Sequence, residues 1–267
     1  MASLADYPAT NLVKMLLIGN AGSGKTGALV SLVKAGYKLR ILDYDNLLQS
    51  LIFQIKKHCP DKMGNVDAIT LTDKRKANGT ELILDGVPKA FTETQNILNN
   101  WPGLGKPETW GGDTVVVIDS LTKLSNAAMN WSEIFKAVRG KSGVDYRQVV
   151  GEAQKAITHM IQLLNGKEFN TNVIITAHGR LQEQDGQLKM YPQAPGDKLS
   201  PIIPTYFGTI GMMETRQVGG EAKRLLHTKS TAMIDLRTPA SLDKEYPIET
   251  GLADLFKDLR GELPKAA

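Results

Sequence analysis

Residues 14–26 read Lys-Met-Leu-Leu-Ile-Gly-Asn-Ala-Gly-Ser-Gly-Lys-Thr, a short apolar run followed directly by a glycine-rich turn. The turn matches the pattern Gly-x-x-x-x-Gly-Lys-[Ser/Thr] in full, in which backbone N–H groups surround the phosphates of a nucleotide. A helix is predicted over 24–35, and its positive N-terminal end points at the same anion. This stretch therefore predicts a P-loop whose nucleotide-contacting residues are Gly19, Asn20, Ala21, Gly22, Ser23, Gly24, Lys25, Thr26 and Gly27.

The last two side chains of this loop, Lys25 and Thr26, are expected to have different roles. Lys25 is expected to reach the β- and γ-phosphates, and the Thr26 hydroxyl is expected to bind Mg²⁺. A second candidate ligand is Asp119, which directly follows the run of β-branched residues from Val115 to Ile118. A carboxylate at the carboxyl end of a neighbouring parallel strand can hold Mg²⁺ through water, although aspartate also ends many strands as a turn residue. We therefore expect ATP and Mg²⁺ as cofactors, with Thr26 and Asp119 as the metal-binding residues.

The order of the predicted elements indicates an α/β fold. A strand, a glycine-rich loop, a helix and a further strand form a βαβ unit, which implies a parallel sheet. The strands are almost continuously apolar, as in a sheet that is covered on both faces. Strands are predicted over 14–18, 38–42, 68–71, 114–118 and 172–177, helices over 24–35, 47–57, 91–101 and 146–164, and a surface loop over 102–113.

The pattern changes after Ala177. Alternating segments at 188–190, 209–213, 223–227 and 232–236 are separated by turn signals such as Asp185-Gly186, which predicts antiparallel hairpins. A short helix is expected over 252–259. We predict one domain over residues 1–267, with a nucleotide-binding core at 14–177 and a β-hairpin extension with a C-terminal helix at 178–267. No role is assigned to the long stretch 46–113.

Composition narrows the function classes. The chain has 267 residues, a single cysteine, Cys59, and a net charge of +4, so no disulfide forms within it and a reducing compartment is expected. No run approaches the roughly 18 apolar residues of a membrane span, and residues 1–11 lack the features of a secretory signal. We expect a cytoplasmic location without membrane contact. The basic balance permits contact with nucleic acid but does not require it.

The residue after Asp119 bears on how water is activated. The AAA+ class places a glutamate there, and this chain has Ser120. In RecA-like ATPases the base lies instead at the end of the strand after the P-loop helix, a position that is similar to 43–45 here, and a carboxylate near the γ-phosphate can orient and deprotonate water. Asp45 is the first candidate for this base and Asp43 is the second. An alternative is that the two aspartates cap the helix that follows.

A polar residue also ends the strand at 172–177. His178 is expected where the carboxyl edge of the sheet faces the ligand, so it is a candidate for sensing the γ-phosphate and relaying its loss to the following loop. A lone histidine is as often structural, and both interpretations stay open.

Together these motifs resemble those of RecA-like core ATPases, most closely the small phage-encoded proteins of recombination and single-strand annealing. The resemblance rests on 19–26, 42–45, 115–120 and 174–178, and it extends loosely to 194–200 and 235–239. It implies a RecA-like P-loop fold, ATP hydrolysis stimulated by DNA, and a location in the cytoplasm of a host cell. It also implies self-association into a ring or filament, with ATP at the subunit interfaces.

The same resemblance implies a basic residue that reaches across each interface. Lys229 and Arg237 are the candidates, with Arg216 and Arg224 as alternatives, and each of them can also be an ordinary solvated charge. The chain departs from the family's pattern at Asp45, where a glutamate is usual, and this change could slow hydrolysis. The separate N-terminal domain of the recombinases is not expected, because the P-loop begins only 19 residues into the sequence.

Single-stranded DNA is the expected partner, with a single-strand-binding protein as a further one. The family places its DNA loops after sheet-edge strands, which indicates residues 125–145 and 180–200. The second segment holds as many acids as cations and is not a basic patch. The first combines aromatics with cations, as single-strand binders do, or is a surface helix whose aromatics face the core. Its residues are Trp131, Phe135, Lys136, Arg139 and Lys141.

Two other classes of function remain open. A small-molecule kinase, such as a nucleotide kinase, also begins with a P-loop, but no Arg-rich lid segment is found here. A GTPase is disfavoured because no Asn-Lys-x-Asp motif occurs. The second alternative is an ATP-loaded module that binds DNA or recruits a partner with negligible hydrolysis, which the aspartate at position 45 keeps open.

Overall fold

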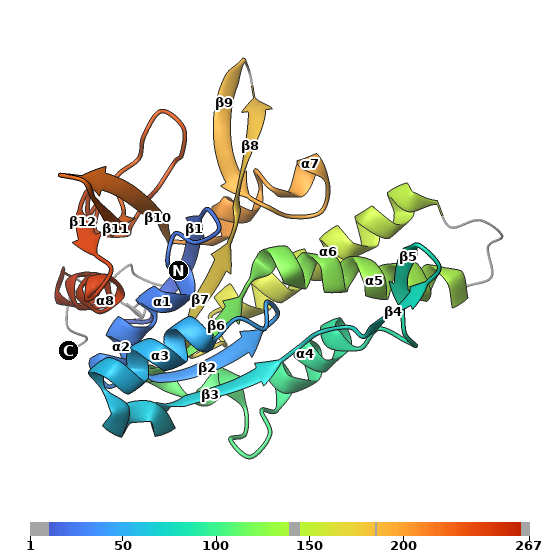
Figure 1. Ribbon diagram of the computed structural model, residues 1–267, viewed down its shortest axis with the longest axis horizontal. Coiled ribbons are helices and arrows are strands. Elements are labelled where there is room, and N and C mark those ends of the chain that lie inside the picture. Colours follow the sequence, from blue (N-terminus) through green and yellow to red (C-terminus); the bar gives the residue numbers. More distant parts are fainter. Residues whose placement is uncertain (1–10, 139–144, 185, 263–267) are drawn as a thin grey trace, which may run out of the picture.

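The computed structural model describes residues 11–138, 145–184 and 186–262. Its centre is an eight-stranded sheet in the order β12-β11-β10-β1-β7-β6-β2-β3 (Figure 1). The strands from β10 to β3 in this order pair in parallel. β11 pairs antiparallel with both of its neighbours, β10 and β12. This confirms the expected α/β architecture, a mainly parallel sheet with antiparallel strands near the C-terminus. The strands are β1 (Lys14–Gly19), β2 (Lys38–Asp43), β3 (Val66–Thr70), β6 (Gly111–Asp119), β7 (Thr171–Ala177), β10 (Thr209–Val218), β11 (Glu221–His227) and β12 (Glu245–Pro247).

Helices cover both faces of this sheet (Figure 1). One face carries α4 (Ala90–Asn99), α5 (Leu121–Val138) and α6 (Tyr146–Asn165). The other carries α1 (Lys25–Ala28), α2 (Val30–Lys34), α3 (Gln49–His58) and α8 (Gly251–Glu262). The central strands are therefore apolar at nearly every position, because each of their side chains meets a helix layer.

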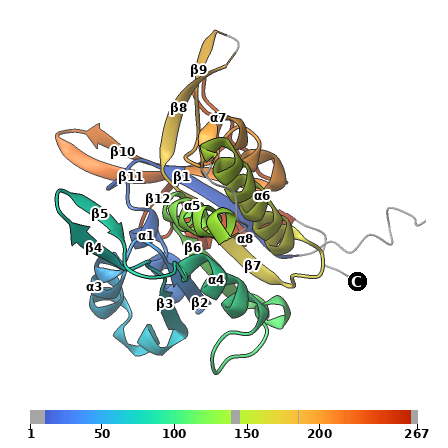
Figure 2. The ribbon, with the colours of Figure 1, turned by 90° about the vertical axis from the view of Figure 1, so that its right-hand side faces the viewer.

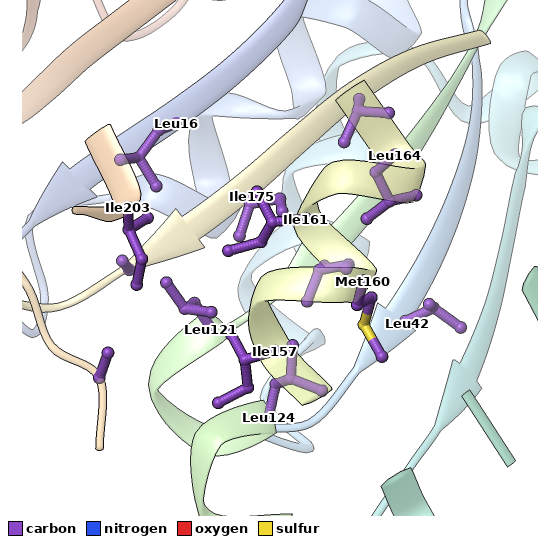
Figure 3. Close-up of a cluster of buried hydrophobic side chains, with 14 of the residues drawn as sticks. Leu16, Leu42, Leu121, Leu124, Ile157, Met160, Ile161, Leu164, Ile175 and Ile203 are labelled. Carbon is purple, nitrogen blue, oxygen red and sulfur yellow. The ribbon is translucent and has the colours of Figure 1, made fainter. Parts of the chain in front are cut away.

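Side chains alternate along β1 and so divide the core into two layers. Leu16 lies in the layer of α6, where Figure 3 shows it near Ile175 and Ile161. Leu17 lies in the opposite layer, with α1, α2 and α8. Each buried side chain of this size contributes roughly 1.5–3 kcal/mol to the free energy of unfolding. Packing on both faces fixes β1, β7, β6 and β2 side by side, so that their carboxyl ends share one edge.

Two hairpins stand outside the main sheet. β4 (Arg75–Asn78) pairs with β5 (Glu81–Leu84), and β8 (Gly179–Gln184) pairs with β9 (Gln187–Pro192). The second hairpin projects from the body of the molecule (Figures 1 and 2). The short elements that complete the chain are the 3₁₀ turns η2 (Pro60–Asn65), η3 (Pro107–Thr109) and η4 (Ile203–Tyr206) and the helix α7 (Gly196–Leu199).

The sequence predictions for the C-terminal part need two corrections. β10 is not only a hairpin strand, because it pairs in parallel with β1 and thereby joins the core sheet. The strand expected at 232–236 is wrong. There the Ser230 hydroxyl accepts from the Leu236 N–H at 2.9 Å and donates to the Leu236 carbonyl at 2.8 Å. These side-chain bonds hold a loop in place of a strand ladder.

Two further predictions differ from the structure in their limits. The surface loop expected over 102–113 is interrupted by η3, and β6 already begins at Gly111. The helix expected over 24–35 is divided into α1 and α2 at Leu29. Within the described ranges, no helix is both long enough and apolar enough to cross a membrane.

Candidate nucleotide-binding site

The glycine-rich turn between β1 and α1 folds around its own lysine. The Lys25 ammonium donates to the Gly19 carbonyl at 2.8 Å and to the Asn20 carbonyl at 3.0 Å. Burial lowers the pKa of Lys25, and the nearby charges of Asp119 and Asp45 act in the opposite direction. Gly24 has a φ of 98°, a left-handed conformation that strains any residue with a Cβ. The loop thus presents a cation held by backbone groups that a phosphate could replace.

Asp119 lies at the end of β6 and both of its carboxylate oxygens have partners. The Thr26 hydroxyl donates to Oδ2 at 2.6 Å, and the Thr176 hydroxyl of β7 donates to Oδ1. The strand of Asp119 is not the neighbour of β1, as the sequence had suggested, because β7 lies between them. Thr26 still reaches Asp119, because α1 begins at the same sheet edge. A hydroxyl beside a carboxylate fits Mg²⁺, which prefers oxygen ligands and usually binds one or two carboxylates together with phosphates.

The two aspartates after β2 are placed differently. Asp43 is buried and accepts the Asn46 N–H at 2.8 Å, so it stabilises the turn. Asp45 lies at the cavity that also contains Lys25 and Asp119, and its carboxylate accepts the Ser120 hydroxyl at 3.2 Å. Burial and then the charge of Asp119 raise the pKa of Asp45. Asp45 is therefore the carboxylate that faces the phosphate end of the site.

His178 follows β7 and also reaches this cavity. Its Nδ1 lies 3.5 Å from the Lys25 ammonium, and its backbone N–H donates to the Thr122 hydroxyl at 3.1 Å. Burial, followed by the charge of Lys25, lowers the pKa of His178. A neutral imidazole next to the P-loop lysine can respond to a phosphate bound there.

These groups line one cavity of about 550 Å³. It also contains residues that sequence reasoning missed. Lys123, in the first turn of α5, comes only four positions after Asp119. Its closeness in sequence to Asp119 was a signal that could have identified it. The rim residues near β11 and β12 had no local signal, because strand pairing far along the chain brings them there. Arg224 was expected only as a cation for a neighbour's site. The missed residues are Val30, Lys34, Leu47, Lys123, Ile248, Glu249, and the α3 side chains Ser50, Gln54 and His58.

The candidates for a cation donated to a neighbour are scattered. Arg237 donates to the backbone carbonyls of Phe207 and Pro204. Arg216 is paired with two glutamates, at 3.1 and 3.2 Å. Lys229 is exposed after β11, outside the cavity. Arg224 is at the cavity of its own chain. A role across an interface stays a prediction for these residues.

For the first candidate DNA segment, residues 125–145, the structure supports the alternative of a surface helix over the described part. Its described part up to Val138 continues α5. Trp131 stacks on Phe135 at 5.1 Å between ring centroids and packs on Phe91 at 5.3 Å, so these aromatics belong to helix packing. They lie at i and i+4, the spacing of one helix face. Lys136 is on the same helix, whereas Arg139 and Lys141 are outside the described residues.

The second candidate segment, 180–200, forms the β8–β9 hairpin and α7. Arg180 pairs with Asp197 at 2.8 Å, and Lys189 pairs with Asp235 at 3.0 Å. The expectation that this segment is not a basic patch agrees with these ion pairs.

A buried strand, a glycine-rich loop that holds a lysine, and a threonine hydroxyl bonded to an aspartate on a second strand define a P-loop nucleotide-binding protein. The family model described as "AAA domain" matches residues 11–239, and the chain belongs to this family of P-loop ATPases. Its motif retains the departure seen in the sequence, since Ser120 and not glutamate follows Asp119.

No curated protein matches the chain. Among solved structures, it is similar to a KaiC-like protein of Pyrococcus horikoshii, with 14% identity, a TM-score of 0.46, and coverage of 88% of this chain and 84% of the other. It is also similar to the flagellar accessory protein FlaH of Methanocaldococcus jannaschii, with 12% identity, a TM-score of 0.40, and coverage of 90% and 80%.

Replacing Asp45 with asparagine is expected to raise thermal stability at neutral pH. The raised pKa of Asp45 means that the folded state binds a proton more tightly than the unfolded state, so the wild type loses stability as the pH rises through that pKa. Asparagine removes this loss. Melting temperatures of both proteins should differ most at neutral pH and converge in acid. A variant that is less stable than the wild type at neutral pH would show that the Asp45 carboxylate stabilises the fold.

Proposed function

We propose that the protein is an Mg²⁺-dependent, RecA-like ATPase that acts on single-stranded DNA in phage recombination or annealing. The observation that carries the ATPase part is the single cavity in which the Thr26–Asp119 hydrogen bond lies beside Lys25 and Asp45. This combination supplies a phosphate-binding loop, a metal-binding pair and a carboxylate base. Each of them is required for phosphoryl transfer to water.

The roles of the residues follow from their positions. Lys25 neutralises charge on the transferring phosphoryl group. Asp45 orients a water and accepts its proton while the water oxygen bonds to the γ-phosphorus and the bond to the bridging oxygen breaks. When bound, Mg²⁺ offsets the charge of the phosphate oxygens, and Thr26 and Asp119 are the residues that would hold it.

His178 supports the proposal at a further step. Its ring nitrogen lies next to the Lys25 ammonium, so a change in the charge held by Lys25 alters the electrostatic environment of the ring. The residue that follows is Gly179, the first of the β8–β9 hairpin. A change at His178 when the γ-phosphate is lost can thus alter the position of the β8–β9 hairpin through Gly179.

The single-stranded DNA part of the proposal rests on the motif resemblance and on the basic net charge of +4. We propose self-association with ATP at the interfaces as part of the same function, with a basic residue donated by the neighbour. Lys229 is the remaining candidate for that residue, because it is exposed and does not line the cavity of its own chain.

ATP turnover is expected to rise when single-stranded DNA is added. The stimulation should fall as salt increases. Binding of cationic side chains to DNA phosphates releases counterions, and this release is less favourable at high salt, so the affinity for DNA falls. Phosphate release is measured with single-stranded DNA, with duplex DNA and without DNA, across a salt series. If single-stranded DNA does not change the turnover at low salt, the DNA part of the proposal is rejected and the ATPase part is unaffected. A phosphorylated nucleoside product would instead identify a nucleotide kinase.

A further inference from the structure

Arg224 of β11 and Ile248, which directly follows β12, lie over the P-loop. A Cβ placed on Gly24 would be 2.6 Å from Cδ1 of Ile248 and 3.0 Å from Cδ of Arg224. The two residues are fixed as a pair, because the Ile248 N–H donates to the Arg224 carbonyl at 3.1 Å. Antiparallel pairing of β11 with β12 brings them together. The loop at Gly24 is thus covered by the aliphatic part of the Arg224 side chain and by the side chain of Ile248, both of the same chain.

The charge of Arg224 is not used by the fold. Within the described residues, no ion pair involves Arg224, whereas Arg216 on the adjacent strand is paired with two glutamates. The Arg224 side chain is exposed and borders the cavity. A planar cation held beside a binding loop, without a carboxylate to neutralise it, is suited to a flat or anionic ligand.

The cavity has chemically different ends. Lys25, Asp45 and Asp119 lie at the end that suits phosphates and Mg²⁺. Ile248 borders the cavity on the β12 side and packs against the buried layer of α1, α2 and α8, so it offers an apolar surface. The nucleoside of a bound nucleotide must lie beyond the loop, because the loop backbone itself encloses the phosphates.

We propose that Arg224 and Ile248 form the nucleoside subsite of their own chain's P-loop. The guanidinium of Arg224 stacks on a face of the base, and Ile248 packs against the base as an apolar platform. This proposal rests on the nucleotide binding proposed above and adds where the base is recognised. It also assigns Arg224 to its own subunit, in place of the alternative in which it reaches a neighbour's site.

Other residues of the same cavity provide the competing location. Ser50, Gln54 and His58 of α3 line the cavity, together with Val30 and Leu47. The three α3 side chains are polar, so apolar contact with a base placed there would come from Val30 or Leu47. Gln54 therefore gives a comparison variant, because it lines the same cavity from α3.

Binding of ATP and of inorganic tripolyphosphate separates the nucleoside contacts from the phosphate contacts. Ile248→Ala and Arg224→Lys are each expected to weaken ATP binding by about tenfold, equivalent to 1.4 kcal/mol. Tripolyphosphate binding should stay within about twofold of the wild type, because lysine keeps the charge and loses only the planar stack. Gln54→Ala should leave both affinities unchanged, and Lys25→Ala should weaken both.

The outcomes against the proposal are distinct. Unchanged ATP affinity in Ile248→Ala and Arg224→Lys would overturn the subsite, and equal losses for tripolyphosphate would make it a phosphate contact. A loss in Gln54→Ala alone would place the base along α3. A wild type that binds neither ligand would instead reject the proposed nucleotide function as a whole.

Mixing two defective variants tests whether Arg224 serves its own chain. Lys25→Ala and Arg224→Ala are combined, and ATP turnover is measured at low ATP concentration. If both residues act within one chain, no intact site is created and turnover equals the average of the two variants. Turnover clearly above that average would show that Arg224 completes a neighbour's site and would overturn the assignment.

Discussion

Replacing Lys25 with alanine is expected to lower ATP turnover by about 10²–10³-fold, the usual effect of removing one preorganised charge donor from a transition state. The structure gives the reason, because the Lys25 ammonium is held by two loop carbonyls at the position where phosphates would bind. Lys123 and Lys34 also line the cavity, but they lie on α5 and α2 and not in the loop that encloses the phosphates.

Lys34→Ala is the matched control for this experiment. Lys34 borders the same cavity but lies at the far end of α2 and is exposed. It carries the same charge, so a general electrostatic effect would appear in both variants. Turnover should fall only in Lys25→Ala. Equal losses in the two variants, or full turnover in Lys25→Ala, would contradict the assigned role of the loop lysine.

Asp119→Asn is expected to lower turnover by about 100-fold or more and to shift the Mg²⁺ dependence to higher concentration. Asparagine keeps the shape, and its single carbonyl oxygen can still accept one of the two hydrogen bonds that Thr26 and Thr176 donate to Asp119. It removes the negative charge that holds a divalent cation. The measurement is phosphate release over an Mg²⁺ titration, together with a thermal melt to confirm that the variant is folded.

The control lies on the same strand. Asp113 is at the opposite end of β6, where it is exposed and paired with Lys38 at 3.3 Å. Asp113→Asn changes the charge of the protein by the same amount, and the Mg²⁺ dependence should stay as in the wild type. An unchanged Mg²⁺ dependence in Asp119→Asn would separate this carboxylate from the metal.

The phosphate end of the site could be predicted because its signals are local. The loop from Gly19 to Thr26 has a fixed spacing, and Asp119 ends an uninterrupted apolar strand. What spacing could not provide was the order of strands. Thr176, which anchors Asp119 from the intervening strand β7, is recognised only once that order is known.

The sequence alone could not decide whether Asp43 or Asp45 is the candidate base, and the structure was needed to place their carboxylates. Asp43 ends β2 and Asp45 comes two positions later, so period-two alternation sends them to the same side of an extended chain. The chain turns after Asp43, whose carboxylate accepts the Asn46 N–H. Asp45 is thereby directed to the cavity, beside Ser120.

Of the two interpretations of 125–145, a DNA-binding segment or a surface helix with core-facing aromatics, the structure supports the helix over the described part. Aromatics mixed with cations are typical both of a strand-binding surface and of an amphipathic helix. Trp131 and Phe135 resolve the choice by their contacts, because they stack on one another and Trp131 also packs on Phe91 of α4. The position of Ile248 at the cavity had no comparable signal in the sequence, since β11–β12 pairing places it over Gly24.

Equilibrium binding of ATP in the presence of Mg²⁺ tests the central claim most directly. Calorimetry of the wild type and of folded Lys25→Ala protein gives both affinity and stoichiometry. The P-loop site predicts saturable binding of ATP to the wild type and severely weakened binding to Lys25→Ala. Equal binding by the two proteins, or no binding by the wild type, would contradict it.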